Sequence, residues 1–164
     1  MTPTRHVESI TAVADTADPG ATPASQAARL TQLLSVEIHS HFDDVALARR
    51  VSDGLPVRSV SRLAEMIGKA RIVGPVVPEP TLRRAQKARK PLSREHSERL
   101  YELSRVLDAV DRAYHGDRAQ LTAFLTRPHP LLDGETPLDM TRSSSAGADA
   151  VLNLLRRADA GVAV

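Results

Sequence analysis

The stretch LSREHSERLYELSRVLDAVDRAYHGD, residues 92–117, decides the fold because its apolar residues recur every three or four positions. Ser93 is a good N-cap for a helix here, and Gly116 is a typical stop. The apolar residues that share one face of this helix are Leu100, Leu103, Leu107, Val110 and Tyr114. Burying such side chains contributes roughly 1.5–3 kcal/mol each before ordering costs. The stretch therefore predicts a long amphipathic helix that anchors an all-α protein.

Composition restricts the class of protein. The chain has 164 residues and is 41% hydrophobic but only 2% aromatic, so its core has to be built mainly from Leu, Val and Ala. It has no cysteine, which excludes disulfides and thiolate metal sites. No apolar run approaches the roughly 18 residues of a membrane helix, and residues 1–20 lack the apolar core of a signal peptide. We expect a cytoplasmic protein without a membrane partner.

Upstream of the long helix the sequence predicts a tail and three shorter helices. Residues 1–24 hold three prolines and no sustained period, which is typical of a flexible tail. Ser25 caps a first helix, a second covers residues 42–54 and a third covers residues 57–68. The residues expected on the buried side of the second helix are Val45, Leu47 and Ala48.

A basic segment, TLRRAQKARK at residues 81–90, follows a proline-rich connection. Thr81 stands where an N-cap belongs, and six basic residues fall between Arg83 and Arg94 with no acid among them. The residues expected on one helical face are Arg83, Arg84, Lys87 and Lys90. Such a helix after a compact helix pair is typical of a helix-turn-helix DNA reader, but a solvated basic surface helix fits composition equally well. The candidate DNA-binding residues are Thr81, Arg83, Arg84, Lys87, Arg89 and Lys90.

Charge is distributed unevenly along the chain. Residues 1–90 carry 13 Lys and Arg against nine Asp and Glu, whereas residues 91–164 carry nine against eleven. Such asymmetry indicates that the two parts meet different partners. We therefore expect one helical region over residues 25–91 and another over residues 92–164.

The C-terminal part predicts three more helices around a proline-rich connection. Asp117 with Gln120 forms a capping-box pattern that opens the first, and Thr136-Pro137 predicts a single-turn helix, PLDM. The last helix ends at Gly161, and its apolar face is formed by Val151, Leu154, Leu155 and Ala158. Three prolines and Gly134 restrict the connection at 126–140, either to hold the last helix at one angle or simply for stability.

Four motifs in order then resemble a known family. They are LSREHSERL at 92–100, Phe124-Leu125, PHPLLDGETPLDM at 128–140 and GADAVLNLLRRADAG at 147–161. Together they resemble antitoxins of the Xre/ParS/MbcA group, whose C-terminal domain binds a RES-domain toxin. The departures from the family pattern are Phe124 for a tryptophan, His129 for an asparagine, and Glu79, Pro80 and Ala85 where arginines are common.

The resemblance implies a fold and a function. It implies an all-α protein with an Xre-like helix-turn-helix region at 25–91 and a toxin-binding domain at 92–164. The toxin would be a RES-domain enzyme that hydrolyses NAD or ADP-ribosylates a target, and the final helix with Arg157 would cover its NAD pocket. DNA binding would repress the operon, and the chain would form a homodimer or a larger hetero-oligomer with the toxin. The toxin-binding residues so implied are Leu131, Leu132, Gly134, Thr136, Pro137, Leu138, Gly147, Val151, Leu154, Leu155, Arg157 and Gly161.

Other classes of protein remain as alternatives. No nucleophile elbow, HExxH motif, glycine-rich phosphate loop or EF-hand loop is present, so we expect neither catalysis nor a bound cofactor or metal. The main alternative is a stand-alone helix-turn-helix repressor of transcription without a toxin partner. A purely structural adaptor is the third class.

Overall fold

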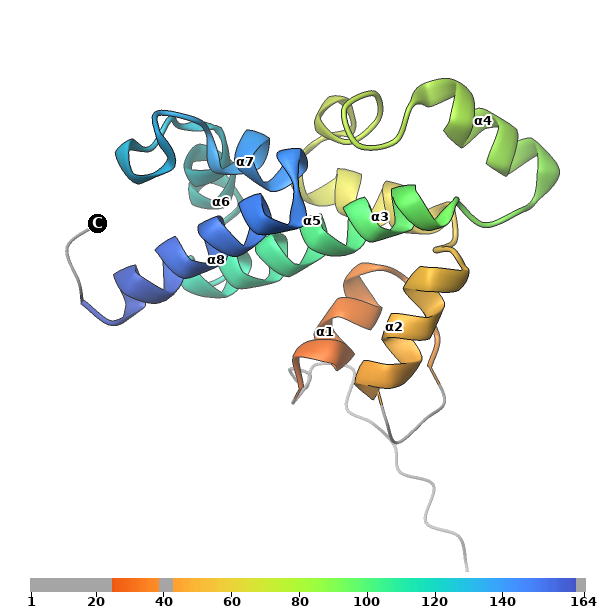
Figure 1. The fold of residues 1–164 in the computed structure, drawn as a ribbon, viewed down its shortest axis with the longest axis horizontal. Helices are drawn as coiled ribbons and strands as arrows, with labels where there is room; N and C mark the ends of the chain where they lie inside the picture. Colours follow the sequence, from red (N-terminus) through yellow and green to blue (C-terminus); the bar gives the residue numbers. More distant parts are fainter. Residues whose placement is uncertain (1–24, 39–42, 162–164) are drawn as a thin grey trace, which may run out of the picture.

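The computed structural model describes residues 25–38 and 43–161, which form an all-α fold (Figure 1). The flexible tail expected at residues 1–24 lies outside this described part of the chain. The helices are α1 (Gln26–Leu33), α2 (Asp43–Asp53), α3 (Arg58–Ile67), η1 (Lys69–Arg71), α4 (Glu79–Ala88), α5 (Arg94–Ala113), α6 (Arg118–Thr126), η2 (Pro130–Leu132), α7 (Pro137–Ser143) and α8 (Ser145–Asp159), where η denotes a 3-10 helix.

Helix α5 runs through the middle of the molecule, and α8 lies alongside it (Figure 1). The N-cap of α5 is Ser93, whose hydroxyl accepts a hydrogen bond from the backbone N–H of His96. Four of the five residues expected on its apolar face are buried, and the fifth, Tyr114, is the half-buried C-cap. The long amphipathic helix expected at 92–117 is therefore confirmed.

The N-terminal helices pack on one side of α5. Ser25 caps α1 as expected, because its side chain accepts a hydrogen bond from the backbone of Ala28. The expected buried side of α2 is wrong in part, since Leu47 is buried but Val45 is 52% exposed and Ala48 is exposed. Leu47 faces the core together with Val51, four residues on, whereas a residue two positions away lies almost on the opposite side of a helix.

Contacts across residue 91 join the N-terminal helices to α5. Arg29 on α1 makes a bidentate ion pair with the buried Asp108 of α5, at 2.7 and 3.0 Å. The buried Ser97 hydroxyl of α5 accepts a 2.8 Å hydrogen bond from the backbone N–H of Leu55. One hydrophobic cluster includes residues of α1, α2, α3, α5, α6, α7 and α8. The two regions expected on either side of residue 91 therefore share one hydrophobic core. The division into two domains stays a prediction.

Helix α4 projects from one end of the molecule (Figure 1). It begins at Glu79 with Pro78 as its N-cap, so the expectation that Thr81 caps it is wrong. Pro80 is tolerated because first-turn N–H groups have no partner within the helix. The helix ends at Ala88, and Arg89 is left-handed with φ 52°. Lys90 therefore does not share the helical face predicted for it.

The C-terminal helices begin with side-chain caps. Asp117 accepts from the backbone of Ala119 and Gln120 at the start of α6, and Thr136 accepts from the backbone of Asp139 at the start of α7. Helix α7 has seven residues and is longer than the single turn expected. Ser144 both ends α7 and caps α8, so these helices meet at a sharp corner. The proline-rich connection leads directly into α7, and its 3-10 helix η2 also contacts α8.

Candidate functional site

The residues expected to bind a toxin lie in two different environments. The buried ones are Leu132, Pro137, Leu138, Gly147, Val151, Leu154 and Leu155. The exposed ones are Leu131, Gly134, Arg157 and Gly161. Thr136 is half-buried, and its side chain is occupied as the cap of α7. Most of these residues therefore build the core of the C-terminal helices. The residues accessible to a partner in this conformation are the exposed ones, together with Leu154 and Leu155 where they line a surface hollow.

Leu131 stands on a closed turn that hydrogen bonds hold in shape. The carbonyl oxygen of His129 accepts from the backbone N–H groups of Leu132 and Gly134, at 3.0 and 3.1 Å. The His129 N–H in turn donates to the carbonyl of Glu135 at 3.0 Å. Asp133 and Gly134 both have positive φ, which reverses the chain after η2. The side chain of Leu131 is thereby presented to solvent, 53% exposed, from an ordered backbone.

A hollow of about 560 Å³, here called the C-terminal groove, opens between the end of α5, α6 and the last two turns of α8. The Tyr114 and Phe124 rings lie in it with their centroids 5.9 Å apart. Leu154 and Leu155 of α8 line its other side, so much of its wall is apolar. Its polar lining residues are Gln120, Arg127, His129 and Asp159. A groove of this kind can accept apolar side chains of a partner while its polar residues set the hydrogen bonds.

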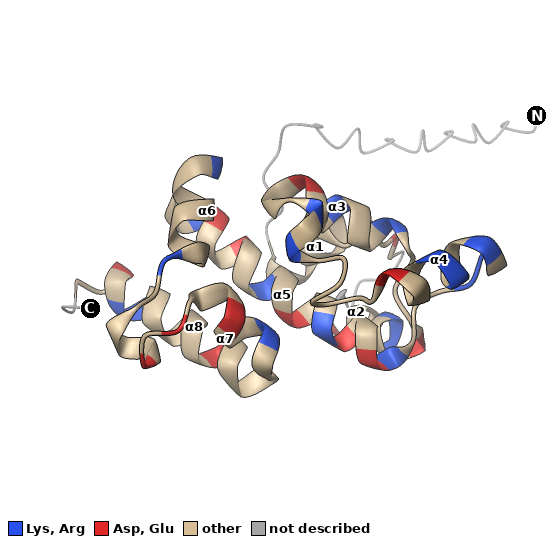
Figure 2. Ribbon diagram, turned by 90° about the horizontal axis from the view of Figure 1, so that it is seen from above, with Lys and Arg blue, Asp and Glu red and all other residues tan. Residues whose placement is uncertain are grey.

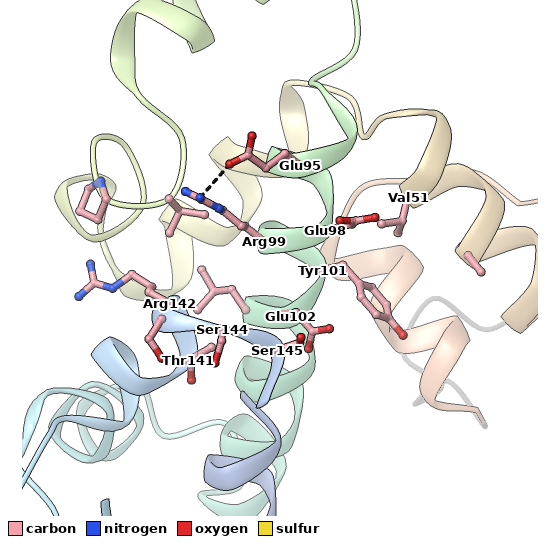
Figure 3. A pocket seen from close by; sticks show the side chains of 15 residues that line it. Val51, Glu95, Glu98, Arg99, Tyr101, Glu102, Thr141, Arg142, Ser144 and Ser145 are labelled. Atoms are coloured by element: carbon pink, nitrogen blue, oxygen red, sulfur yellow. Dashed lines mark hydrogen bonds and ion pairs between the residues drawn. The ribbon is translucent and has the colours of Figure 1, made fainter. Parts of the chain in front are cut away.

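A second hollow, of about 510 Å³, lies where α2, the first half of α5 and the α7–α8 corner meet (Figure 3). Its charged groups are already paired within the chain, with Arg99 donating to Glu95 at 2.8 Å and Arg105 to Glu102 at 2.6 Å. Burial raises the pKa of Tyr101, an effect that Arg105 opposes and Glu102 and Asp44 reinforce. The hollow is therefore a place where helices of the chain meet and where these charged side chains pair within the chain. In the part of the chain that the structure describes, no group of three or more His, Asp and Glu side chains could hold a metal ion.

The candidate DNA-binding residues lie at the end of the molecule that carries α4, where blue segments gather in Figure 2. Thr81 is half-buried, whereas the five basic residues are all exposed. Arg83 also forms an exposed ion pair with Glu79 at 3.1 Å. Residues 68–78, which join α3 to α4, include η1 and are longer than the three or four residues of a helix-turn-helix turn. The order of helices therefore fits a DNA reader, but the turn departs from that motif.

Two basic residues that sequence reasoning missed lie close to the end of α4. Arg50 of α2 and Arg58 of α3 line the same hollow as Arg89 and Lys90. They are about 30 to 40 positions from Arg89 along the chain, so no local spacing could have grouped them. Only the packing of the N-terminal helices brings these four cations together.

The fold places the protein in the class of all-α proteins. Comparison with known families narrows it, because the family model for the antitoxin Xre/MbcA/ParS C-terminal toxin-binding domain matches residues 112–161. This segment contains the end of α5, α6, η2, α7 and α8, and hence both Leu131 and every residue that lines the C-terminal groove. The similarity supports a role as the antitoxin of a toxin–antitoxin pair, which is a regulatory rather than a catalytic role. No curated protein matches the chain.

None of the helices within residues 25–38 and 43–161 is both long and apolar enough to span a lipid bilayer.

Proposed function

We propose that this chain is the antitoxin of a RES-domain toxin and that it binds the toxin through the exposed surface of residues 112–161. The single observation that carries this proposal is the coincidence of the family match with the C-terminal groove and the exposed Leu131. By resemblance to its family, the chain would cover the toxin's NAD-binding pocket. Inhibition would then be steric exclusion of NAD, with no chemical step in this protein.

Leu131 is suited to be an anchor in this interface. Its backbone is already ordered by the hydrogen bonds of the turn, so a partner that covers it loses little ordering entropy. Burying a leucine side chain that is fully exposed contributes roughly 1.5–3 kcal/mol, and Leu131 begins about half exposed. Arg157 is exposed on α8, and a guanidinium can bind a carboxylate or phosphate through two hydrogen bonds.

The buried residues of the site would act by supporting that surface. Val151, Leu154 and Leu155 hold α8 against the rest of the core. Deleting residues 147–164 would remove these core side chains as well as any toxin contact, so its effect on neutralisation would not separate the two roles. A substitution at an exposed position is a sharper test.

The test is Leu131→Glu, co-expressed with the growth-arresting RES-domain protein that this proposal expects the adjacent reading frame to encode. We expect cells to stop growing, because a carboxylate at this position would be desolvated against the toxin. The matched control is Val45→Glu, since Val45 is 52% exposed but lies on α2, outside the matched segment. Both variants should keep the wild-type melting temperature.

Two outcomes would contradict the proposal. Full neutralisation by a folded Leu131→Glu variant would remove the turn from the interface. An adjacent frame that encodes no growth-arresting protein would favour the stand-alone repressor instead.

We further propose that α4 binds operator DNA and represses the operon. Arg84 and Lys87 are exposed and three positions apart, so both are available to DNA phosphates. A homodimer, or a larger complex with the toxin, would place two copies of α4 on one operator, as two-fold DNA readers do.

A further inference from the structure

Four cations from three helical segments converge on one hollow of about 510 Å³, here called the basic cleft. Arg50 belongs to the last turn of α2, Arg58 to the first turn of α3, and Arg89 with Lys90 follows α4. Pro56, Val57, Ala85, Gln86 and Pro91 complete its walls, so none of the described residues that line it is acidic. All four cationic residues are exposed. The cleft is therefore a positively charged and accessible concavity.

Two of the four cations occupy positions that are locally unfavourable. Arg89 has φ 52°, in the left-handed region where glycine is the usual residue and where a side chain is strained. Arg58 lies at the start of α3, where the helix dipole favours acids, and the first turn of α3 contains none. Backbone conformation therefore gives no reason for an arginine at position 89, and the helix dipole gives none for an arginine at position 58. That both costly cations line the same hollow points to a role for their charge.

Pairing within the protein leaves most of this charge available. Within the described chain, Arg50, Arg89 and Lys90 form no ion pair. Arg58 donates through Nε to the carbonyl of Ser35 at 2.7 Å, and its Nη2 lies 4.0 Å from the largely exposed Glu37. The planar guanidinium of Arg58 is thereby oriented but not neutralised, because an exposed pair at that distance is weak.

We infer that the basic cleft binds the sugar-phosphate backbone of duplex DNA beside α4. Ala85 and Gln86 of α4 line the cleft, whereas Arg84 and Lys87 do not, so the two sets of cations extend from different sides of the helix. Phosphate contacts that flank a DNA-reading helix fix its register on the duplex. The inference rests on the DNA-binding proposal and adds the strand contact that would hold α4 in place.

The experiment measures how the affinity of the full chain for a mixed-sequence duplex falls with salt, since that slope counts the phosphates contacted. Each phosphate contributes a slope of about −0.9 in log affinity against log salt. Arg50→Gln and Arg89→Gly should each reduce the magnitude of the wild-type slope by about 0.9. The control is Arg156→Gln, which removes an exposed arginine from α8 and should leave the slope unchanged.

Arg89→Gly also separates binding from folding. Glycine relieves the left-handed strain, so this variant should melt at a higher temperature than wild type while it binds DNA less tightly. A merely structural Arg89 would not give this opposite pair of changes, and a loss of affinity in a more stable protein is not unfolding.

The possible outcomes separate this inference from the proposal beneath it. In one outcome, the double variant Arg84→Gln, Lys87→Gln reduces the magnitude of the slope while Arg50→Gln and Arg89→Gly keep the wild-type slope. That result would overturn phosphate binding by the basic cleft and would leave DNA binding by α4 in place. If the wild-type chain binds no duplex at low salt, both are overturned. If the cleft variants lose affinity for the toxin and keep it for DNA, the cleft binds an acidic protein surface, and the inference is wrong.

Discussion

Gly147 of α8 lies in very close contact with α7. A Cβ atom at this position would lie 2.1 Å from the carbonyl oxygen of Met140 and 2.8 Å from the Ser143 hydroxyl. Both atoms belong to α7, and the first is backbone, so the helices would have to separate. The glycine that the family resemblance singled out is therefore explained by packing at the corner between α7 and α8.

The prediction at this scale concerns Gly147→Ala. Alanine normally stabilises a helix by about 1 kcal/mol relative to glycine, so the substitution would be stabilising at a position without close neighbours. Here we expect a loss of about 1–3 kcal/mol from overpacking against α7, measured by chemical unfolding followed by circular dichroism. Asn153→Ala, at an exposed position of the same helix, serves as the control and should not be destabilised. A Gly147→Ala variant more stable than wild type would refute the packing argument.

At the scale of elements, α7 depends on a charged residue near its start. The Asp139 carboxylate accepts a 2.6 Å hydrogen bond from the Thr136 hydroxyl and another from Arg142. These hydrogen bonds, that from Thr136 first, lower the pKa of Asp139 below its ordinary value of 3.8, with burial opposing them. Since the pKa is lower in the folded state, the stabilisation is present above about pH 4 and is lost as the pH falls through the folded pKa.

The stability of Asp139→Asn should accordingly depend less on acid than that of wild type. We expect wild type to melt at the higher temperature near neutral pH, and the difference to shrink as the pH falls below about 4. Melting curves at a series of pH values measure this, with the exposed Glu135→Gln as a control that keeps the wild-type profile. A difference that does not change with pH would show that the Asp139 charge contributes nothing.

Elements with local signals were predictable from sequence. Ser25, Ser93, Asp117 and Thr136 cap helices as expected, because a cap is set by a few neighbouring residues. The start of α4 was not predictable in this way. Thr81 is a good cap, but the helix begins at Glu79, because the first turn of a helix tolerates Pro80. The left-handed Arg89 carried no signal, because glycine is the residue that normally marks such a position.

At the scale of the whole molecule, α5 is shared by the expected DNA-binding and toxin-binding regions. It contacts α1 and α2 on one side and α7 and α8 on the other. The ion pair between Arg29 of α1 and Asp108 of α5 joins these two helices. The sequence predicted the periodicity of α5, but it did not predict that α1 and α2 would pack on one side of this helix and α7 and α8 on the other. The apolar face formed by Val151, Leu154 and Leu155 was predictable too, but the sequence did not show that it packs into the protein's own core rather than against a partner.

The candidate surfaces belong to this scale because tertiary packing assembles them. The C-terminal groove joins Tyr114 and Phe124 to α8, and the basic cleft joins Arg50 to Arg89. The cleft belongs to the end that carries α4, while the groove is built from α5, α6 and α8. Toxin and DNA would therefore occupy separate surfaces of one chain, which allows both to be bound together.

The central claim is that the exposed face of residues 112–161 meets the toxin. Amide hydrogen exchange of the chain, free and bound to its toxin, tests this most directly because it reports each segment of backbone separately. We expect slower exchange in the bound state over residues 127–134 and the last turns of α8, with α2 and α4 unchanged. Slower exchange confined to α2 or α4, with the Leu131 turn unchanged, would contradict the account.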